Sequence, residues 1–137
     1  MKKETMTVSK GKVLIMDDEE PIRYTTGRLL DIMGYDSLIA GNGFEAIQLY
    51  KKEMENGRPF DAIILDLIIP GGMGGKEAME KLLEMDKNVK VILTSGYLGD
   101  PILSSYREHG FAGVVLKPYA IEELDRILFR VITGLQL

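Results

Sequence analysis

Residues 60–70, FDAIILDLIIP, decide how this chain folds. The apolar residues from Ala62 to Leu65 lead without alternation into a single acid, Asp66, and Pro70 follows soon after. An uninterrupted apolar run of this length is typical of a central parallel strand that is covered on both faces. Open α/β sheets bind their ligands at the carboxyl ends of such strands. The stretch therefore predicts a buried strand that places a functional carboxylate, Asp66, at its end.

The rest of the chain repeats this alternation of an apolar strand and an amphipathic helix. The expected strands lie at residues 12–17, 35–40, 62–65, 89–94 and 111–116, and helical patterns follow them at residues 21–33, 44–55, 78–83, 100–109 and 121–135. This alternation predicts an α/β fold, a doubly wound parallel sheet of the (βα)5 type with right-handed crossovers. We expect a polar tail at residues 1–10 and one domain at residues 11–137.

The composition of the chain is that of an ordinary globular domain. Of its 137 residues, 45% are hydrophobic and 28% are charged, and the formal net charge is -4. This balance gives no reason to expect a nucleic acid partner, which would favour a basic surface. Disulfides and thiolate metal sites are excluded because the chain has no cysteine. The sequence shows no signal peptide and no apolar run near the ~20 residues that a membrane span needs. We therefore expect a cytoplasmic protein without a membrane partner.

Polar residues gather where the expected strands end. They are Asp17 and Asp18 after the first strand, Asp66 after the third, Thr94 and Ser95 after the fourth, and Lys117 after the fifth. The carboxyl ends of parallel strands meet at one edge of a sheet, so these side chains can converge. Three carboxylates beside one lysine leave an excess of negative charge, which is costly unless a cation joins them. A hard cation with oxygen ligands, Mg²⁺ or alternatively Mn²⁺, is the natural partner.

Each of these residues also has an ordinary structural explanation when it is taken alone. An acid at a strand end is usually a helix cap, and a lysine before a proline is usually a solvated loop residue. Arg23 and Arg28 are interpreted in the same way, as solvated helix residues. Taken together, acids, a hydroxyl and a lysine at the ends of several strands of one parallel sheet favour a functional site.

Four motifs of the chain resemble the receiver domains of two-component response regulators. The motifs are VLIMDDEEPIR, FDAIILDLIIPGGMGGKEA, VILTSGY and GVVLKPY, and they cover residues 12 to about 134 in the order and spacing of that family. The sequences of these motifs are most similar to those of receivers of hybrid sensor histidine kinases. The resemblance implies a flavodoxin-like fold with strand order 2-1-3-4-5.

The resemblance also assigns roles to individual residues. It makes Asp66 the phosphoacceptor, Asp18 a direct metal ligand and Asp17 a neighbour that reaches the metal through water. It assigns a metal-binding main-chain carbonyl to Ile68. It makes Thr94 the hydroxyl that bonds the phosphoryl group and Ser95 its neighbour in the switch. It makes Lys117 the catalytic lysine and Pro118 the proline that follows a cis peptide bond.

The function that this resemblance implies is signalling. The domain would take a phosphoryl group onto Asp66 from the phosphohistidine of a histidine kinase or a histidine phosphotransfer protein, in a Mg²⁺-dependent reaction. It would catalyse only its own phosphorylation and dephosphorylation, so it is not an enzyme for another substrate. The phosphoryl group would switch a surface that binds a downstream effector or a second copy of the chain, as in a phosphorelay.

Two features depart from the usual pattern of the family. Val114 stands three residues before the lysine, where the family has a switch aromatic, and neither Tyr106 nor Tyr119 is its equivalent. The GGMGG loop after Pro70 is one residue longer than the common pattern.

Two other functions stay open at this stage. A pseudo-receiver would bind partners without ever taking a phosphoryl group. An aspartate-nucleophile phosphohydrolase of the haloacid dehalogenase type would use Asp66 on free phosphomonoesters. That class places a second acid two residues after the nucleophile, where this chain has Ile68.

Overall fold

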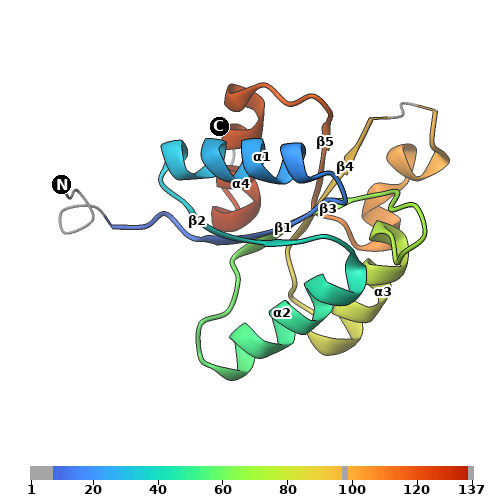
Figure 1. Cartoon of the computed structure of the whole chain (residues 1–137), viewed down its shortest axis with the longest axis horizontal. Coiled ribbons are helices and arrows are strands. Elements are labelled where there is room, and N and C mark those ends of the chain that lie inside the picture. The colour runs from blue at the N-terminus through green and yellow to red at the C-terminus, as the bar shows by residue number, and fades with distance from the viewer. Residues whose placement is uncertain (1–7, 97–98, 136–137) are drawn as a thin grey trace.

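The computed structural model of the chain describes residues 8–96 and 99–135. Positions 1–7 of the expected tail, residue 97 of the third motif and positions 136–137 of the expected domain lie outside the described residues. The described strands form one parallel sheet in the order β2-β1-β3-β4-β5, as expected (Figure 1). The strands are β1 (Lys12–Met16), β2 (Asp36–Ala40), β3 (Ala62–Asp66), β4 (Val91–Ser95) and β5 (Gly113–Leu116).

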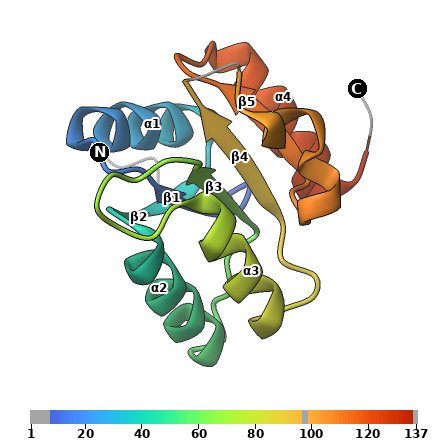
Figure 2. The same ribbon diagram turned by 90° about the vertical axis from the view of Figure 1, so that its right-hand side faces the viewer.

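Helices cover both faces of this sheet, which agrees with the predicted doubly wound architecture. The α-helices are α1 (Glu20–Met33), α2 (Gly43–Glu55), α3 (Gly75–Met85) and α4 (Ile121–Thr133). Helices α1 and α4 lie on one face, and α2 and α3 lie on the other (Figures 1 and 2). Side chains alternate across each strand, so Ile63 and Leu65 pack toward α2 and α3, whereas Ile64 packs toward α1 and α4.

Local sequence signals explain where the first helix begins and ends. Pro21 lies in the first turn of α1, where the missing N–H costs no hydrogen bond. Gly34 ends the helix in the left-handed conformation, with a φ of 98°. Between these two residues, Thr26, Leu30 and Met33 face the core. Helix α1 therefore starts directly after the acids that follow β1.

The expected fourth helix, at residues 100–109, is wrong in type. The structure has two short 3₁₀ helices there, η2 (Pro101–Ser104) and η3 (Tyr106–His109), in place of one α-helix. The expected cap is present, because the Asp100 carboxylate accepts a hydrogen bond from the N–H of Ile102 at 3.0 Å. The hydroxyl of Ser104 donates to the carbonyl of Pro101 at 3.0 Å. Such local bonds compete with the α-helical pattern.

The last helix is shorter than its apolar period suggested. Gly134 adopts the left-handed conformation with a φ of 77°, and α4 ends at Thr133. Leu135, which we expected on the apolar stripe, therefore lies beyond the helix and is 59% exposed. The buried stripe consists of Leu124, Leu128 and Val131.

Candidate functional site

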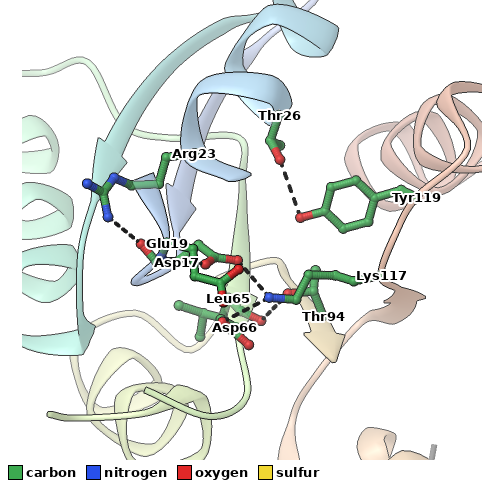
Figure 3. Close-up of polar contacts among 9 residues, drawn as sticks. All are labelled: Asp17, Glu19, Arg23, Thr26, Leu65, Asp66, Thr94, Lys117 and Tyr119. Atoms are coloured by element: carbon green, nitrogen blue, oxygen red, sulfur yellow. Dashed lines mark hydrogen bonds and ion pairs between the residues drawn. The ribbon is translucent and has the colours of Figure 1, made fainter. Parts of the chain in front are cut away.

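The ammonium group of Lys117 lies between two carboxylates that come from different strands. Its Nζ is 2.9 Å from Oδ2 of Asp17 and 3.1 Å from Oδ2 of Asp66 (Figure 3). The register of the sheet explains this meeting: Asp17 follows β1, Asp66 ends β3, and the N–H of Lys117 donates to the carbonyl of Ser95 at the end of β4. Residues far apart in the sequence thus meet at the carboxyl edge of the sheet.

The carboxylates form a compact acidic cluster. One carboxylate oxygen each from Asp17, Asp18 and Asp66 lies within 4.8 Å of the others. Asp17 and Asp66 are buried, whereas Asp18 is exposed to solvent. The main-chain N–H of Ile68 hydrogen-bonds to Asp66, and the Ile68 side chain is 53% exposed beside it. The metal-binding role of the Ile68 carbonyl stays a prediction.

The environment shifts the pKa values of Asp66 and Lys117. Burial raises the pKa of the Asp66 carboxyl; the hydrogen bond and charge of Lys117 oppose this, and the charge of Asp17 adds to it, with a net upward shift. Burial alone would lower the pKa of Lys117, but its hydrogen bonds to Asp17 and Asp66 and their negative charges raise it. Lys117 therefore holds its proton more firmly than a free lysine does, and Asp66 ionises less readily than a free aspartate.

We expect the substitution Asp66→Asn to stabilise the metal-free fold at neutral pH. The folded chain holds the Asp66 proton to higher pH than the unfolded chain does, so stability is lost as the pH rises through the raised pKa. Asparagine stays neutral and avoids this loss. Thermal unfolding in a metal-free buffer should show a higher melting temperature for Asp66→Asn than for the native chain at pH 7. The difference should shrink below the ordinary aspartate pKa of about 3.9. Equal melting temperatures for the native chain and Asp66→Asn, at pH 7 and also below pH ~3.9, would contradict the burial argument.

The two expected switch residues of β4 lie next to Asp66. Thr94 is the register partner of Asp66 and is 1% exposed, and its hydroxyl donates to the carbonyl of Leu65 at 3.3 Å. Ser95 is 2% exposed and lines the cleft above the site. The peptide bond between Lys117 and Pro118 is cis, which agrees with the resemblance.

The long loop after Pro70 folds back over the end of β3. A Cβ atom on Gly75 would lie 2.8 Å from the carbonyl oxygen of Asp66, and one on Gly74 would lie 2.7 Å from that of Leu67. Only glycine allows this close approach. The loop also bonds to α2, because the N–H of Gly43 donates to the carbonyl of Met73 at 2.9 Å. The two glycines thus let α3 start directly against the site.

Sequence reasoning missed two side chains of this region. Arg23, interpreted as a solvated residue, donates from Nη1 to the carbonyl oxygen of Asp17 at 2.8 Å (Figure 3). Tyr119 accepts a hydrogen bond at its hydroxyl from Thr26 of α1, at 3.4 Å. The motif VLIMDDEEPIR did contain Arg23, but no periodic pattern marks a side chain that bonds to the main chain.

A cleft of about 680 Å³ opens from the acidic cluster along α1. Apolar side chains of α1 (Pro21, Ile22 and Leu29) line this cleft together with Pro118 and Tyr119. Asp66 and Lys117 also belong to its lining. Its volume falls in the range of about 300–1,000 Å³ that is usual for ligand sites.

Comparison with known proteins decides the family. The model of the response regulator receiver domain matches residues 13–129 of the chain. This chain belongs to the receiver family. Within it, the chain is 33% identical to sporulation initiation phosphotransferase F of Bacillus subtilis, over 82% of this chain and 86% of that protein. It is 27% identical to sensor kinase CckA of Brucella abortus, over 90% of this chain and 13% of that protein.

The solved structures give the same fold for this receiver. A response regulator receiver domain protein from Clostridium thermocellum superposes with a TM-score of 0.80 at 22% identity, over 93% of this chain and 96% of that one. The receiver spans about half the length of other curated relatives, which are described as transcriptional regulators. Among the described residues, the helices are all too short or too polar to cross a membrane.

Phosphorylation-dependent signalling is the standard function of this family, so the receiver is a signalling domain. The expected resemblance and strand order are therefore confirmed. Relatives of both expected kinds, response regulators and a sensor kinase, are among its matches. The roles of the individual site residues stay predictions.

Proposed function

We propose that Asp66 accepts a phosphoryl group from the phosphohistidine of a histidine kinase or a histidine phosphotransfer protein. A carboxylate oxygen of Asp66 attacks phosphorus, the N–P bond breaks, and the imidazole leaves with its electron pair and takes up a proton. The observation that carries this proposal is the placement of the Lys117 ammonium 3.1 Å from Asp66, next to two further acids. We place the exchange in the cytoplasm.

The residues of the acidic cluster fit a hard divalent cation. Their oxygens lie close together, and the raised pKa of Asp66 reflects burial next to the charge of Asp17. Asp18 and Asp66 would bind Mg²⁺ directly, with Mn²⁺ as a substitute, and Asp17 and the Ile68 carbonyl would complete the set. When bound, the ion would neutralise the carboxylates and the incoming phosphoryl oxygens. Metal-dependent formation of an acyl phosphate that hydroxylamine cleaves tests the proposal.

Lys117 supplies the second positive charge. Its hydrogen bonds to Asp17 and Asp66 hold the ammonium in place before the reaction, so no reorganisation is needed when charge develops on the phosphoryl oxygens. The same residues support slow hydrolysis of the aspartyl phosphate, in which water is the acceptor. The receiver would thus catalyse both its own phosphorylation and its dephosphorylation.

The cleft beside Asp66 gives a protein donor its approach. A phosphohistidine must reach Asp66 in line, and Ile22 and Leu29 line the same cleft as Asp66. A histidine kinase or phosphotransfer protein with an apolar helix face would pack against these two side chains. After transfer, a downstream effector or a second copy of the chain would bind the switched surface around β4 and β5.

Thr94→Ala is expected to separate phosphorylation from switching. The Thr94 hydroxyl is next to Asp66 in register and now bonds to the carbonyl of Leu65, so it can move to a phosphoryl oxygen. The variant should still take up a phosphoryl group from acetyl phosphate. Backbone NMR shifts of β5 and of the 3₁₀ segment, residues 101–109, should change on phosphorylation in the native chain and stay nearly constant in the variant.

The control is Thr133→Ala, which removes an exposed threonine hydroxyl from the last residue of α4, outside the segments that are measured, and should leave those shifts as in the native chain. Phosphorylation-dependent shifts of equal size in Thr94→Ala would contradict a switching role for this hydroxyl. That outcome matters here because Val114 provides no aromatic side chain to relay the change.

A further inference from the structure

Asp17 is held at every polar atom that it possesses. Its N–H donates to the carbonyl of Ala40 at 3.1 Å, and its Oδ1 accepts from the N–H of Glu19 at 2.9 Å. Its Oδ2 accepts from Lys117 at 2.9 Å, and its carbonyl oxygen accepts from Nη1 of Arg23 at 2.8 Å. Two of these partners are cationic side chains, Lys117 and Arg23, and of these two the catalytic proposal uses only Lys117.

The carbonyl of Asp17 lies in a gap between two regular elements. Strand β1 ends at Met16, so this carbonyl is beyond the strand. The first helical hydrogen bonds of α1 run to the carbonyl of Glu19, from the N–H groups of Ile22 and Arg23, at 3.1 and 3.0 Å. A buried carbonyl needs a partner, and the side chain of Arg23 provides it by reaching back over the first turn of its own helix.

The guanidinium group of Arg23 also rests against the turn between β2 and α2. A Cβ atom on Gly41 would lie 3.5 Å from Nη1 of Arg23, which is ordinary contact distance. The N–H of Gly41 is itself bonded to Glu45 at 2.8 Å. Among the described residues, Arg23 forms no ion pair with a carboxylate. Its hydrogen bond goes to the main chain, which indicates a positioning role.

We propose that Arg23 is a positioning residue that fixes the Asp17–Asp18 peptide in the orientation that metal binding requires. The peptide unit is planar, so the carbonyl oxygen of Asp17 and the Cα atom of Asp18 lie in one plane. Anchoring that oxygen therefore fixes the peptide plane and the position of the Asp18 Cα atom, from which the exposed Asp18 carboxylate extends. This inference rests on the proposed function of the same site.

The alternative role for Arg23, a purely electrostatic one, predicts the opposite sign. A positive charge near the acidic cluster weakens the attraction for a cation, so its removal alone would tighten Mg²⁺ binding. Removal of an orienting bond would weaken binding instead. Residues that orient metal ligands typically change affinity by a factor of about 10–100. The direction of the change thus separates the two roles.

The experiment is calorimetric titration of the full chain with Mg²⁺, for the native protein and three variants. Arg23→Met keeps the apolar stem but removes the donor, and it should weaken Mg²⁺ binding by about tenfold. Arg23→Lys keeps a donor of similar reach and should recover most of the affinity. Arg28→Met removes the same charge from an exposed position on α1 and should bind as the native chain does.

A kinetic readout complements the binding data. The Mg²⁺ concentration that gives half-maximal phosphorylation by acetyl phosphate should rise about tenfold in Arg23→Met, whereas the rate at saturating Mg²⁺ should stay close to native. Unchanged or tighter Mg²⁺ binding in Arg23→Met would overturn the proposal. If this variant fails to fold, Arg23→Gln answers the same question, since its side chain is polar but too short to replace the guanidinium at the Asp17 carbonyl. Weaker Mg²⁺ binding in Arg23→Gln would support the proposal, and native binding would overturn it.

Failure of this inference is distinguishable from failure of the proposed function. A native chain that binds Mg²⁺ but takes up no phosphoryl group would contradict the proposed function and leave the positioning role intact. If the native chain takes up a phosphoryl group and Arg23→Met binds Mg²⁺ as tightly as the native chain, only the role of Arg23 is contradicted. A native chain that binds no Mg²⁺ would contradict both.

Discussion

Asp66→Asn is expected to abolish phosphoryl uptake, with a loss of about 10³-fold or more, as is typical when a nucleophile is removed. Asparagine matches aspartate in size and keeps an acceptor oxygen for Lys117, but its amide is not a nucleophile toward phosphorus. We do not expect a neighbouring acid to replace Asp66. Asp18 is exposed, and Asp17 already accepts hydrogen bonds at both of its carboxylate oxygens. Acetyl phosphate with Mg²⁺ and a stain for protein-bound phosphate measures the uptake.

The matched control for this prediction is Asp36→Asn. Asp36 is an exposed acid at the amino end of β2, at the edge of the sheet opposite the site. Its replacement removes the same charge and should leave uptake unchanged. Retained uptake in Asp66→Asn would mean that the phosphoryl group goes to another residue.

Lys117→Ala is expected to slow phosphoryl uptake by about 10²–10³-fold, the usual cost of losing one preorganised charge donor. The variant removes the ammonium that bonds to Asp17 and Asp66 and leaves two buried carboxylates side by side. Because Lys117 lowers the pKa of Asp66, its loss should raise that pKa further. The rate of uptake should therefore fall at neutral pH, and the midpoint of its pH profile should move to higher pH.

Two comparisons sharpen the result for Lys117. Lys117→Arg keeps the charge in a larger planar group and should recover part of the rate and most of the pH profile. Lys90→Ala removes a lysine that donates to the carbonyl of Ile132 at 3.0 Å, away from the site, and should leave both unchanged. A native rate and an unshifted pH profile in Lys117→Ala would exclude the proposed role.

The sheet, and the edge of the sheet that carries the site, were predictable because both follow from apolar runs that end in polar residues. The strands β1, β3 and β4 are apolar runs, and parallel strands share one direction, so the residues that follow them meet at one edge of the sheet. Asp66, Thr94 and Lys117 were placed together on this argument, and they lie together in the structure. The order of the strands came from the resemblance and not from the pattern of residues.

The errors arose where two local signals competed. Residues 101–109 contain helix-compatible residues, but the serine hydroxyl that bonds to Pro101 favours tighter turns than an α-helix has. Leu135 continues the apolar period of α4, but Gly134 ends the helix before it. Stop signals such as glycine outweighed periodicity at this end of the chain.

Arg23 could not be placed from the sequence, because its partner is a main-chain carbonyl that carries no residue identity. The same holds for the contact between Thr26 and Tyr119, two side chains that are distant in the chain and have no shared pattern. Such contacts depend on tertiary geometry.

The most direct test of the central claim, that Asp66 is a metal-dependent phosphoacceptor, is the intact mass of the native chain after incubation with acetyl phosphate. We expect a gain of one phosphoryl group in Mg²⁺, no gain in excess EDTA, and no gain for Asp66→Asn under either condition. A folded native chain that binds Mg²⁺ and gains no mass would contradict the account and favour the pseudo-receiver, whereas steady phosphate release from unrelated phosphomonoesters would favour the phosphohydrolase.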